Sequence, residues 1–202
     1  DDEPDDRLAD PEVIAVLDQD DLWHPTKLAR QVTYLQATPE VWVVYTNADH
    51  IDAEGRLIGR RYGTPPGEGW LLERFLRAGV AVPIVTALIR RECLDTVGLF
   101  NERLYGWDDY ELLVRLASRF RFGYLDEPLV QLRYHDTSAW SSERMVLDRF
   151  AVADELASLF PQQAVLIRRF RAVSHLRCGQ YLRSRGDPRG ARGQFRKAIE
   201  LD

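Results

Sequence analysis

The sequence predicts an α/β protein: a mixed sheet with flanking helices, followed by a C-terminal helical segment. Short apolar runs of strand length alternate with segments of helical period over the first 142 residues. From about Glu143 the period is helical throughout. At 202 residues and 45% hydrophobic, the chain is long enough to bury a core. We therefore expect two parts, a sheet-containing domain over residues 1–142 and a helical extension over residues 143–202.

The first elements follow from apolar runs and from turn residues. The run from Val13 to Leu17 predicts a buried strand, and a helix is expected from Pro25 to Ala37. The run from Val41 to Tyr45 predicts another buried strand, and the segment from Ile51 to Ile58 a turn or hairpin. Residues 63–69, with three glycines and two prolines, predict a loop that could move over a site.

The middle of the chain continues this alternation. We expect a helix from Leu71 to Ala78, a strand from Ile84 to Ile89 and a short helix that closes at Gly98. Residues 99–106 form a connecting loop, and a helix with an acidic first turn is expected to run from there to about Ser118.

The last elements are two short strands and a run of helices. The strands are expected at residues 123–125 and 129–133, on either side of Pro128. The segment from Leu176 to Asp202 carries small and aromatic residues at helical spacing and resembles the second half of a tetratricopeptide repeat. A plain helical hairpin accounts for the same pattern, because a single repeat cannot bury its own face.

Composition excludes several classes of function. The net charge of −5, from 27 basic and 32 acidic residues, gives no overall attraction to nucleic acid or to an anionic membrane. No apolar run approaches the roughly 20 residues of a transmembrane helix. Cys93 and Cys178 lie far apart and outside any CxxC spacing, so neither a disulfide framework nor a zinc site is indicated.

Three aspartates follow the first apolar run, at Asp18, Asp20 and Asp21. On a strand, Asp18 and Asp20 would point to the same face with their Cα atoms about 6.6 Å apart. Two such carboxylates, completed by substrate phosphates, suit Mg²⁺ or Mn²⁺. The alternative is that Asp20 and Asp21 cap the following helix, which explains one aspartate and not three.

Several motifs then occur in a fixed order. They are the segments Val16–Leu28, Asn47–Gly55, Leu88–Phe100, Asp108–Ala117 and Glu127–Ser138. Together they resemble a family 2 glycosyltransferase of the GT-A fold, from Val13 to Ser142. The resemblance implies an inverting transfer of a sugar from a nucleotide diphosphate, commonly UDP, to a hydroxyl acceptor such as a saccharide. It also suggests a role in cell envelope polysaccharide biosynthesis.

The resemblance assigns roles to the carboxylates. Asp18, Asp20 and Asp21 would hold the metal and the diphosphate, with Asp20 the principal ligand. Asp109 would be the general base that takes the proton of the acceptor hydroxyl. Asp108 and Glu111 stand beside it, where the family has the other acid at each position. Acids in a first helical turn are also common without catalysis, and Glu111 is placed to pair with the residue four positions on.

Three further residues are candidates by resemblance. His135 would approach the metal or the diphosphate, and Arg133 the substrate. Trp107 would stack on the apolar face of the acceptor sugar. A lone histidine is as often a structural group, so that alternative stays open for His135.

A complete GT-A domain has a nucleotide-binding strand–helix–strand unit ahead of the metal segment. The twelve residues that precede Val13 are too acidic and too poor in apolar residues to form it. We therefore expect this chain to be a partial GT-A domain that binds a nucleotide sugar weakly. We expect an exposed sheet edge that favours self-association, and a cytoplasmic location that could include the inner face of the membrane.

Two other classes of function remain open. A transferase remnant could act as a binding module through its C-terminal helices. A haloacid-dehalogenase-like phosphohydrolase also has a strand ending in DxD, where Asp18 would be the nucleophile. That class needs Thr or Val where Leu22 stands, and it needs a later lysine, for which only Lys197 is available.

Overall fold

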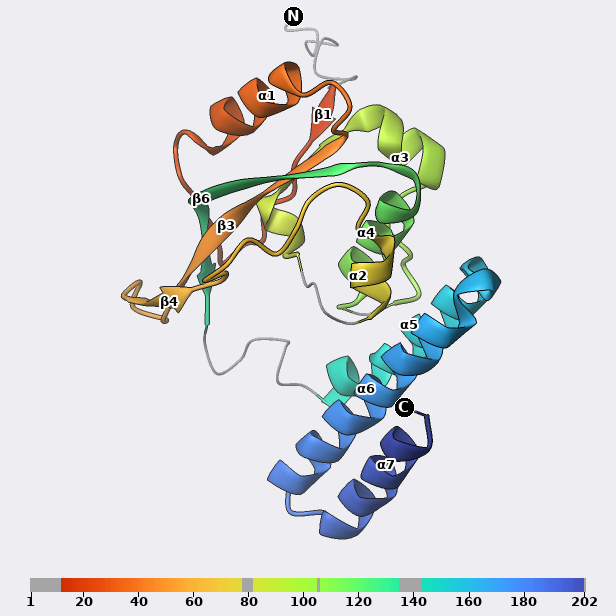
Figure 1. Ribbon diagram of the computed structural model, residues 1–202. Helices are drawn as coiled ribbons and strands as arrows, with labels where there is room; N and C mark the ends of the chain where they lie inside the picture. The colour runs from red at the N-terminus through yellow and green to blue at the C-terminus, as the bar shows by residue number, and fades with distance from the viewer. Residues whose placement is uncertain (1–11, 78–81, 105, 135–142, 202) are drawn as a thin grey trace, which may run out of the picture. The chain divides into compact units, whose positions relative to one another are not determined.

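The computed structural model describes residues 12–77, 82–104, 106–134 and 143–201 (Figure 1). Their contacts form two compact units. The sheet unit runs to Gly69 and continues with Pro83–Leu99 and Arg119–Arg133. The helical unit consists of Trp70–Val82, Phe100–Ser118 and the chain from Tyr134. Each unit is described by itself. The sequence boundary expected after residue 142 lies outside the described residues.

The described part of the sheet unit contains one mixed sheet, as the sequence predicts. Strands β3 and β6 pair in parallel, and the other pairs are antiparallel. The order is β1-β5-β3-β6-β2, with β4 paired to β3, so β1 and β2 end the path. The strands are β1 (Val13–Ile14), β2 (Leu22–Trp23), β3 (Val43–Ile51), β4 (Leu57–Arg60), β5 (Ala87–Arg90) and β6 (Phe122–Arg133).

The central strand β3 is longer than the apolar run predicts. Val43, Val44 and Tyr45 are completely buried, as expected of a strand covered on both faces. The strand then continues through buried polar residues. Asn47 is an example of how hydrogen bonds satisfy them. Its side-chain amide donates to Asp126 Oδ1 at 2.9 Å, and its oxygen accepts from the amide of Tyr62 at 3.1 Å. A hydropathy pattern cannot show that these polar groups are satisfied.

The prediction of a buried strand from Val13 to Leu17 is wrong, because the observed strand is shorter and less buried. Strand β1 has two residues, both half-buried, and pairs only with β5. Leu17 is 50% exposed. An edge strand has a neighbour on one side only, so the chain leaves the sheet early. The rest of the apolar run is a connection in which Ala15 and Val16 are half-buried and Leu17 is exposed.

Two other segments differ from the sequence prediction. Strand β6 is continuous, and its register with β3 shifts around Asn47 and Pro128. A proline lacks the amide that a regular ladder needs, and this shift accommodates it within one strand. The predicted strand from Ile84 to Ile89 begins as a short 3₁₀ helix, η2 (Ile84–Thr86), and becomes β5 at Ala87.

Two helices belong to the sheet unit. Helix α1 (Lys27–Ala37) confirms the predicted helix and buries Lys27, Gln31 and Leu35. Its Tyr34 lies against Gly123 of β6, where a Cβ atom would come within 2.5 Å of the ring. Helix α3 (Arg91–Val97) ends at Gly98, whose φ of 84° and ψ of 175° lie in a region that essentially only glycine adopts.

The helical unit confirms the helices expected in the second half of the chain. It contains α2 (Leu72–Leu76), α4 (Asp108–Arg119), α5 (Glu143–Leu159), η4 (Pro161–Gln163), α6 (Ala164–Ser184) and α7 (Pro188–Leu201). The last residue of α4, Arg119, is assigned to the sheet unit. Helices α6 and α7 form a hairpin whose turn includes Gly186, at a φ of 81° (Figure 1). Among the described residues, no helix has the length and apolar character that crossing a membrane requires.

Candidate functional site

Asp18 to Asp21 form a tight turn between β1 and β2, here called the acidic turn. The amide of Asp21 donates to the carbonyl of Asp18 at 3.3 Å. Asp18 is exposed, whereas Asp20 and Asp21 are half-buried. The prediction that Asp18 and Asp20 share one face of a strand is wrong, because both lie outside the strands. The turn instead places three carboxylates within four residues of a folded-back chain.

Arg133, the last residue of β6, fixes the acidic turn. Its amide donates to Asp21 Oδ1 at 2.9 Å, and its Nε donates to the carbonyl of Asp20 at 3.0 Å. Its Nη1 donates to the carbonyls of Asp52 and Ala53, in the turn between β3 and β4. The guanidinium therefore joins two turns of the sheet unit. The substrate role expected for Arg133 stays a prediction.

Asp21 of the acidic turn lies in a partly buried environment. Partial burial, together with the charges of Asp20 and Asp18, raises the pKa of Asp21 to about 6, while the hydrogen bond from the Arg133 amide opposes this rise. A partly buried carboxylate with two further aspartates within the same four residues is a suitable donor for a hard divalent cation. The residues present therefore fit Mg²⁺ or Mn²⁺.

Further ligands would have to come from elsewhere. Within the described ranges, no group of three or more His, Cys, Asp or Glu side chains forms a metal cluster. Mg²⁺ is commonly held by one or two carboxylates plus substrate phosphates, so two aspartates suffice. His135, the third ligand expected from the sequence, lies outside the described residues.

The second group of carboxylates opens helix α4 in the helical unit. Asp108 and Asp109 are half-buried, and Asp109 Oδ1 accepts from the amide of Tyr110 at 2.5 Å. Glu111 is 1% exposed and forms two hydrogen bonds with Arg115, at 2.7 and 2.9 Å. Glu111 is thus engaged in a buried ion pair, and Asp109 is the more accessible carboxylate for proton transfer.

Trp107, directly before α4, is held by a hydrogen bond from its N–H group and by a cation–π contact with its ring. Its Nε1 donates to the carbonyl of Met145 at 2.8 Å, and the guanidinium carbon of Arg149 lies 4.5 Å from the ring centroid. Burial lowers the pKa of Arg149 to about 10. The preceding Gly106 has a φ of 68°, and a Cβ atom there would lie 2.2 Å from Met145 Sδ. The acceptor-stacking role of Trp107 stays a prediction.

Lys27 and Gln31 are important polar residues that the sequence pattern did not single out. Both are completely buried on helix α1, one helical turn apart. Trp23 precedes Lys27 by the same four residues. This repeated spacing, directly after the acidic turn, is the signal that could have identified them.

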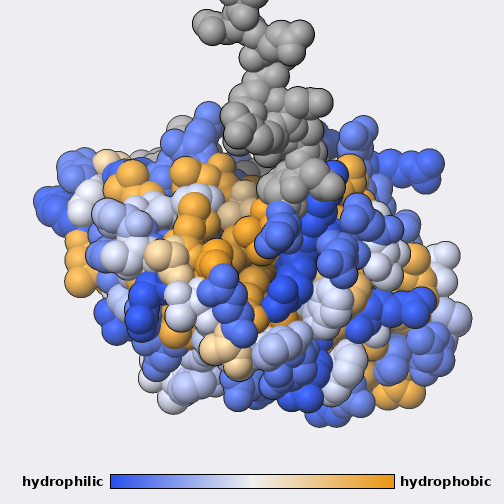
Figure 2. Space-filling model, turned by 90° about the horizontal axis from the view of Figure 1, so that it is seen from above, coloured by the Kyte–Doolittle hydropathy of each residue, from blue (hydrophilic) through white to orange (hydrophobic). Residues whose placement is uncertain are grey.

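Exposed apolar side chains border the acidic turn. Leu17 and Leu22, on either side of it, are 50% and 47% exposed. Figure 2 shows one face of the molecule on which hydrophobic side chains gather in the middle, between hydrophilic ones. The acidic turn is therefore flanked in the sequence by two exposed apolar side chains, one of them in β2.

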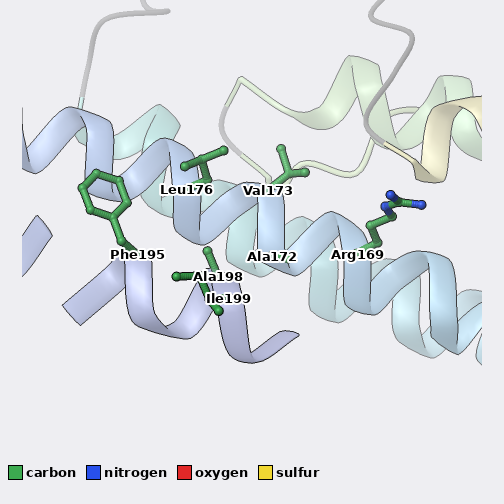
Figure 3. A pocket seen from close by; sticks show the side chains of 7 residues that line it. All are labelled: Arg169, Ala172, Val173, Leu176, Phe195, Ala198 and Ile199. Atoms are coloured by element: carbon green, nitrogen blue, oxygen red, sulfur yellow. The ribbon is translucent and has the colours of Figure 1, made fainter. Parts of the chain in front are cut away.

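A groove of about 460 Å³ lies on the hairpin of α6 and α7 (Figure 3). Its lining holds Arg169 and six apolar residues: Ala172, Val173, Leu176, Phe195, Ala198 and Ile199. Since that lining contains no carboxylate, the groove is unrelated in chemistry to the candidate site.

Comparisons with known proteins agree with the fold. The structure resembles the crystal structure of residues 1–349 of S. aureus TarS, with a TM-score of 0.57 and 14% sequence identity. The match covers 96% of this chain and 58% of TarS 1–349, so this chain spans less than two thirds of that neighbour. The GT-A-type fold expected from the sequence is thereby confirmed. No curated protein matches the sequence.

A family model also matches, over residues 7–157, which is well over half of the chain. The matched region includes both the acidic turn and the carboxylates of α4. The chain therefore belongs to the family described as glycosyltransferase like family 2.

Proposed function

We propose that this chain carries the metal-binding and acceptor-activating residues of an inverting glycosyltransferase. Membership in the family supports glycosyl transfer in general, with a nucleotide-sugar donor and an acceptor. The observation that supports the finer proposal is the acidic turn, in which three aspartates lie within four residues and partial burial raises the pKa of Asp21 to about 6. A site of this kind favours a ligand that brings positive charge.

At the donor end, Asp18 and Asp20 would hold Mg²⁺ or Mn²⁺, and Asp21 would support them. The metal, when bound, supplies a Lewis acid that neutralises charge developing on the leaving diphosphate. Arg133 fixes this turn through the carbonyl of Asp20 and the carboxylate of Asp21. Its contribution is to keep the carboxylates in place, so that little reorganisation is needed when the ligand binds.

At the acceptor end, Asp109 is the proposed general base. The acceptor hydroxyl gives its proton to the Asp109 carboxylate while its oxygen forms a bond to the anomeric carbon. The bond from that carbon to the diphosphate oxygen breaks, and the diphosphate leaves with the electron pair. Attack opposite to the leaving group inverts the anomeric configuration. The buried ion pair of Glu111 and Arg115 would hold the first turn of α4 that carries Asp109.

The test uses Asp109→Asn in the longest form of the protein that its gene encodes. Sugar transfer should fall by about 10²-fold or more, because the general base is lost, while UDP binding in Mn²⁺ stays within about twofold. Asp20→Asn should weaken UDP binding itself. Asp95→Asn, an exposed aspartate of α3, is the matched control and should change neither quantity. Transfer at a near-normal rate by Asp109→Asn would remove that residue from the base role.

A further inference from the structure

Three consecutive backbone carbonyls in the sheet unit each accept a hydrogen bond from a side chain that follows the acidic turn. The carbonyls belong to residues 85–87, where η2 becomes β5. The donors are Trp23, Lys27 and Gln31, which we call the carbonyl clamp. The bonds are Trp23 Nε1 to Val85 O at 3.1 Å, Gln31 Nε2 to Thr86 O at 2.9 Å, and Lys27 Nζ to Ala87 O at 3.5 Å.

The clamp is one connected group. Its members are spaced four residues apart, and on helix α1 that spacing places Lys27 and Gln31 on the same face. Lys27 Nζ also lies 4.2 Å from the centroid of the Trp23 ring, a cation–π distance. Trp23 is therefore held by its own N–H group and by the lysine above its ring.

The clamp buries polar and charged groups, which has a cost in free energy. Lys27 is completely buried, and burial of its ammonium group lowers the pKa to about 8. Gln31 is also buried; its amide donates in addition to Val44 O at 3.0 Å, and among the described residues its Oε1 has no hydrogen-bond partner. Apolar side chains of similar volume would avoid these costs. In return, the hydrogen bonds of these polar side chains fix Trp23 and helix α1 relative to the carbonyls of residues 85–87.

The position that the clamp defines is that of the acidic turn. Trp23 follows Asp21 by two residues, so its placement sets where the turn leaves toward α1. Arg133 fixes the turn from β6, through Asp20 and Asp21. The clamp fixes it from β5, which pairs with the central strand β3. The turn is thus connected to two strands of the sheet by side chains that are not themselves acidic.

We propose that Lys27, with Trp23 and Gln31, is a positioning residue for the metal and diphosphate at the acidic turn. It acts through Trp23 and the carbonyl of Ala87, and it does not touch the donor. This inference rests on the proposed function, because it assigns the clamp to the ligand of that same turn. A clamp that only stabilised the fold would affect the free energy of unfolding and leave the affinity of the turn unchanged.

The experiment compares Lys27→Met with the wild type in the longest form that the gene encodes. Calorimetric titration with UDP in the presence of Mn²⁺ should show affinity about 10-fold weaker for Lys27→Met. Its melting temperature should not fall, since a buried charge has been replaced by an apolar side chain of similar length. In transfer assays, the Mn²⁺ concentration for half-maximal rate should rise about 10-fold, and the rate at saturating Mn²⁺ should stay within about twofold.

Two further variants separate positioning from stability. Trp23→Phe keeps a smaller aromatic ring beneath Lys27 and removes the N–H donor, so its loss of UDP affinity should be smaller than that of Lys27→Met, about threefold. Leu35→Ala removes a buried apolar side chain from the same helix, outside the clamp. It should lower the melting temperature and leave the affinity for UDP with Mn²⁺ unchanged.

The outcomes distinguish this inference from the function on which it rests. If Asp20→Asn weakens UDP binding and Lys27→Met does not, the clamp has no positioning role and the proposed function stands. If Leu35→Ala weakens binding as much as Lys27→Met does, the clamp is a fold-stabilising feature only. If the wild type shows no Mn²⁺-dependent UDP binding, or if Asp20→Asn leaves it unchanged, both proposals are overturned.

Discussion

At Lys27 an ammonium group is enclosed in the sheet unit, with one carbonyl acceptor and the ring of Trp23 as neighbours. Its folded-state pKa of about 8 lies below the ordinary 10.5 of an exposed lysine. Between these two values the unfolded chain holds more protons than the folded protein does. The free energy of unfolding should therefore rise as the pH increases through this window.

The measurement is urea unfolding at several pH values from about 7.5 to 10.5, the range in which the two states differ in protonation. The wild type should gain up to about 3 kcal/mol relative to Lys27→Met across the whole window. Lys197→Met, a substitution at the exposed second lysine, is the control and should keep the wild-type slope. Equal slopes for the wild type and Lys27→Met would show that the pKa of Lys27 is not lowered in the folded protein.

The ion pair of Glu111 and Arg115 gives a second prediction for a single residue. Glu111 is buried, and the Arg115 side chain is 14% exposed. Glu111→Ala removes the buried carboxylate from this pair with the half-buried guanidinium, which should cost about 3–5 kcal/mol of unfolding free energy. Glu73→Ala breaks the exposed pair with Arg77 at the same spacing and should cost under about 0.5 kcal/mol. Similar losses for the two variants, measured by urea unfolding, would contradict this.

The sequence predicted individual functional residues where side chains of one chemical type gather within a recognisable motif. Acidic residues at the turn and at the start of α4 were identifiable because several carboxylates in a few positions exceed what capping needs. Arg133 and Lys27 were harder, since their partners are backbone carbonyls more than fifty positions away. A carbonyl has no residue identity, so a sequence pattern cannot name it as a partner.

At the scale of elements, amphipathic helices were predicted most accurately. Helices α1 and α4 begin and end within about two residues of the predicted bounds, and α3 ends at Gly98 as predicted, because apolar spacing and end residues agree. Strands were less accurate where pairing decides their length. Strand β1 shortens to two residues at the end of the strand order, and β6 runs continuously past Pro128. Pairing partners depend on the tertiary fold and are not encoded in a local apolar run.

The hairpin of α6 and α7 depends on a close approach at Gly179. A Cβ atom there would lie 2.4 Å from Phe195 Cε1, so the ring of Phe195 covers the glycine. Gly179→Ala should lower the free energy of unfolding by about 1–3 kcal/mol through overpacking, despite the better helix propensity of alanine. Thermal and urea unfolding of the intact chain measure this loss.

Two variants show whether the contact itself is responsible. Adding Phe195→Leu to Gly179→Ala should recover part of the loss, which a double-mutant cycle reports as coupling between the two positions. Gly193→Ala, on α7, has no atom within 4 Å of its new Cβ and should stabilise the protein by about 0.5–1 kcal/mol. If Gly179→Ala also stabilises the chain, then the two helices do not approach as closely as described.

At the scale of the whole molecule, the two groups of acidic residues belong to different compact units. The acidic turn is part of the sheet unit, and Asp109 is part of the helical unit. The family match spans both, from residue 7 to residue 157, so the proposed reaction needs both units. The alternation of strands and helices predicted the fold class, but not this division, because α2 and α4 join the C-terminal helices through contacts distant in sequence.

The affinity of the 202-residue chain for its donor is a property of the whole molecule. In the family pattern, a strand–helix–strand unit that binds the nucleotide precedes the acidic segment. Here the described residues before the acidic turn contain one strand, β1, of two residues, and the chain spans 58% of TarS 1–349. In the proposed site the acidic turn would hold the diphosphate and its metal, and we expect it to supply most of the contacts that this chain makes with the donor.

We therefore expect this chain to bind UDP weakly, with a dissociation constant above about 0.1 mM in the presence of Mn²⁺, equivalent to less than about 5.5 kcal/mol of binding free energy. Calorimetric titration measures it directly, and inorganic pyrophosphate is the matched probe. If the diphosphate supplies most of the contacts, UDP and pyrophosphate should bind within about threefold of each other. Micromolar binding of UDP, with much weaker binding of pyrophosphate, would mean that this chain contains a nucleotide pocket of its own.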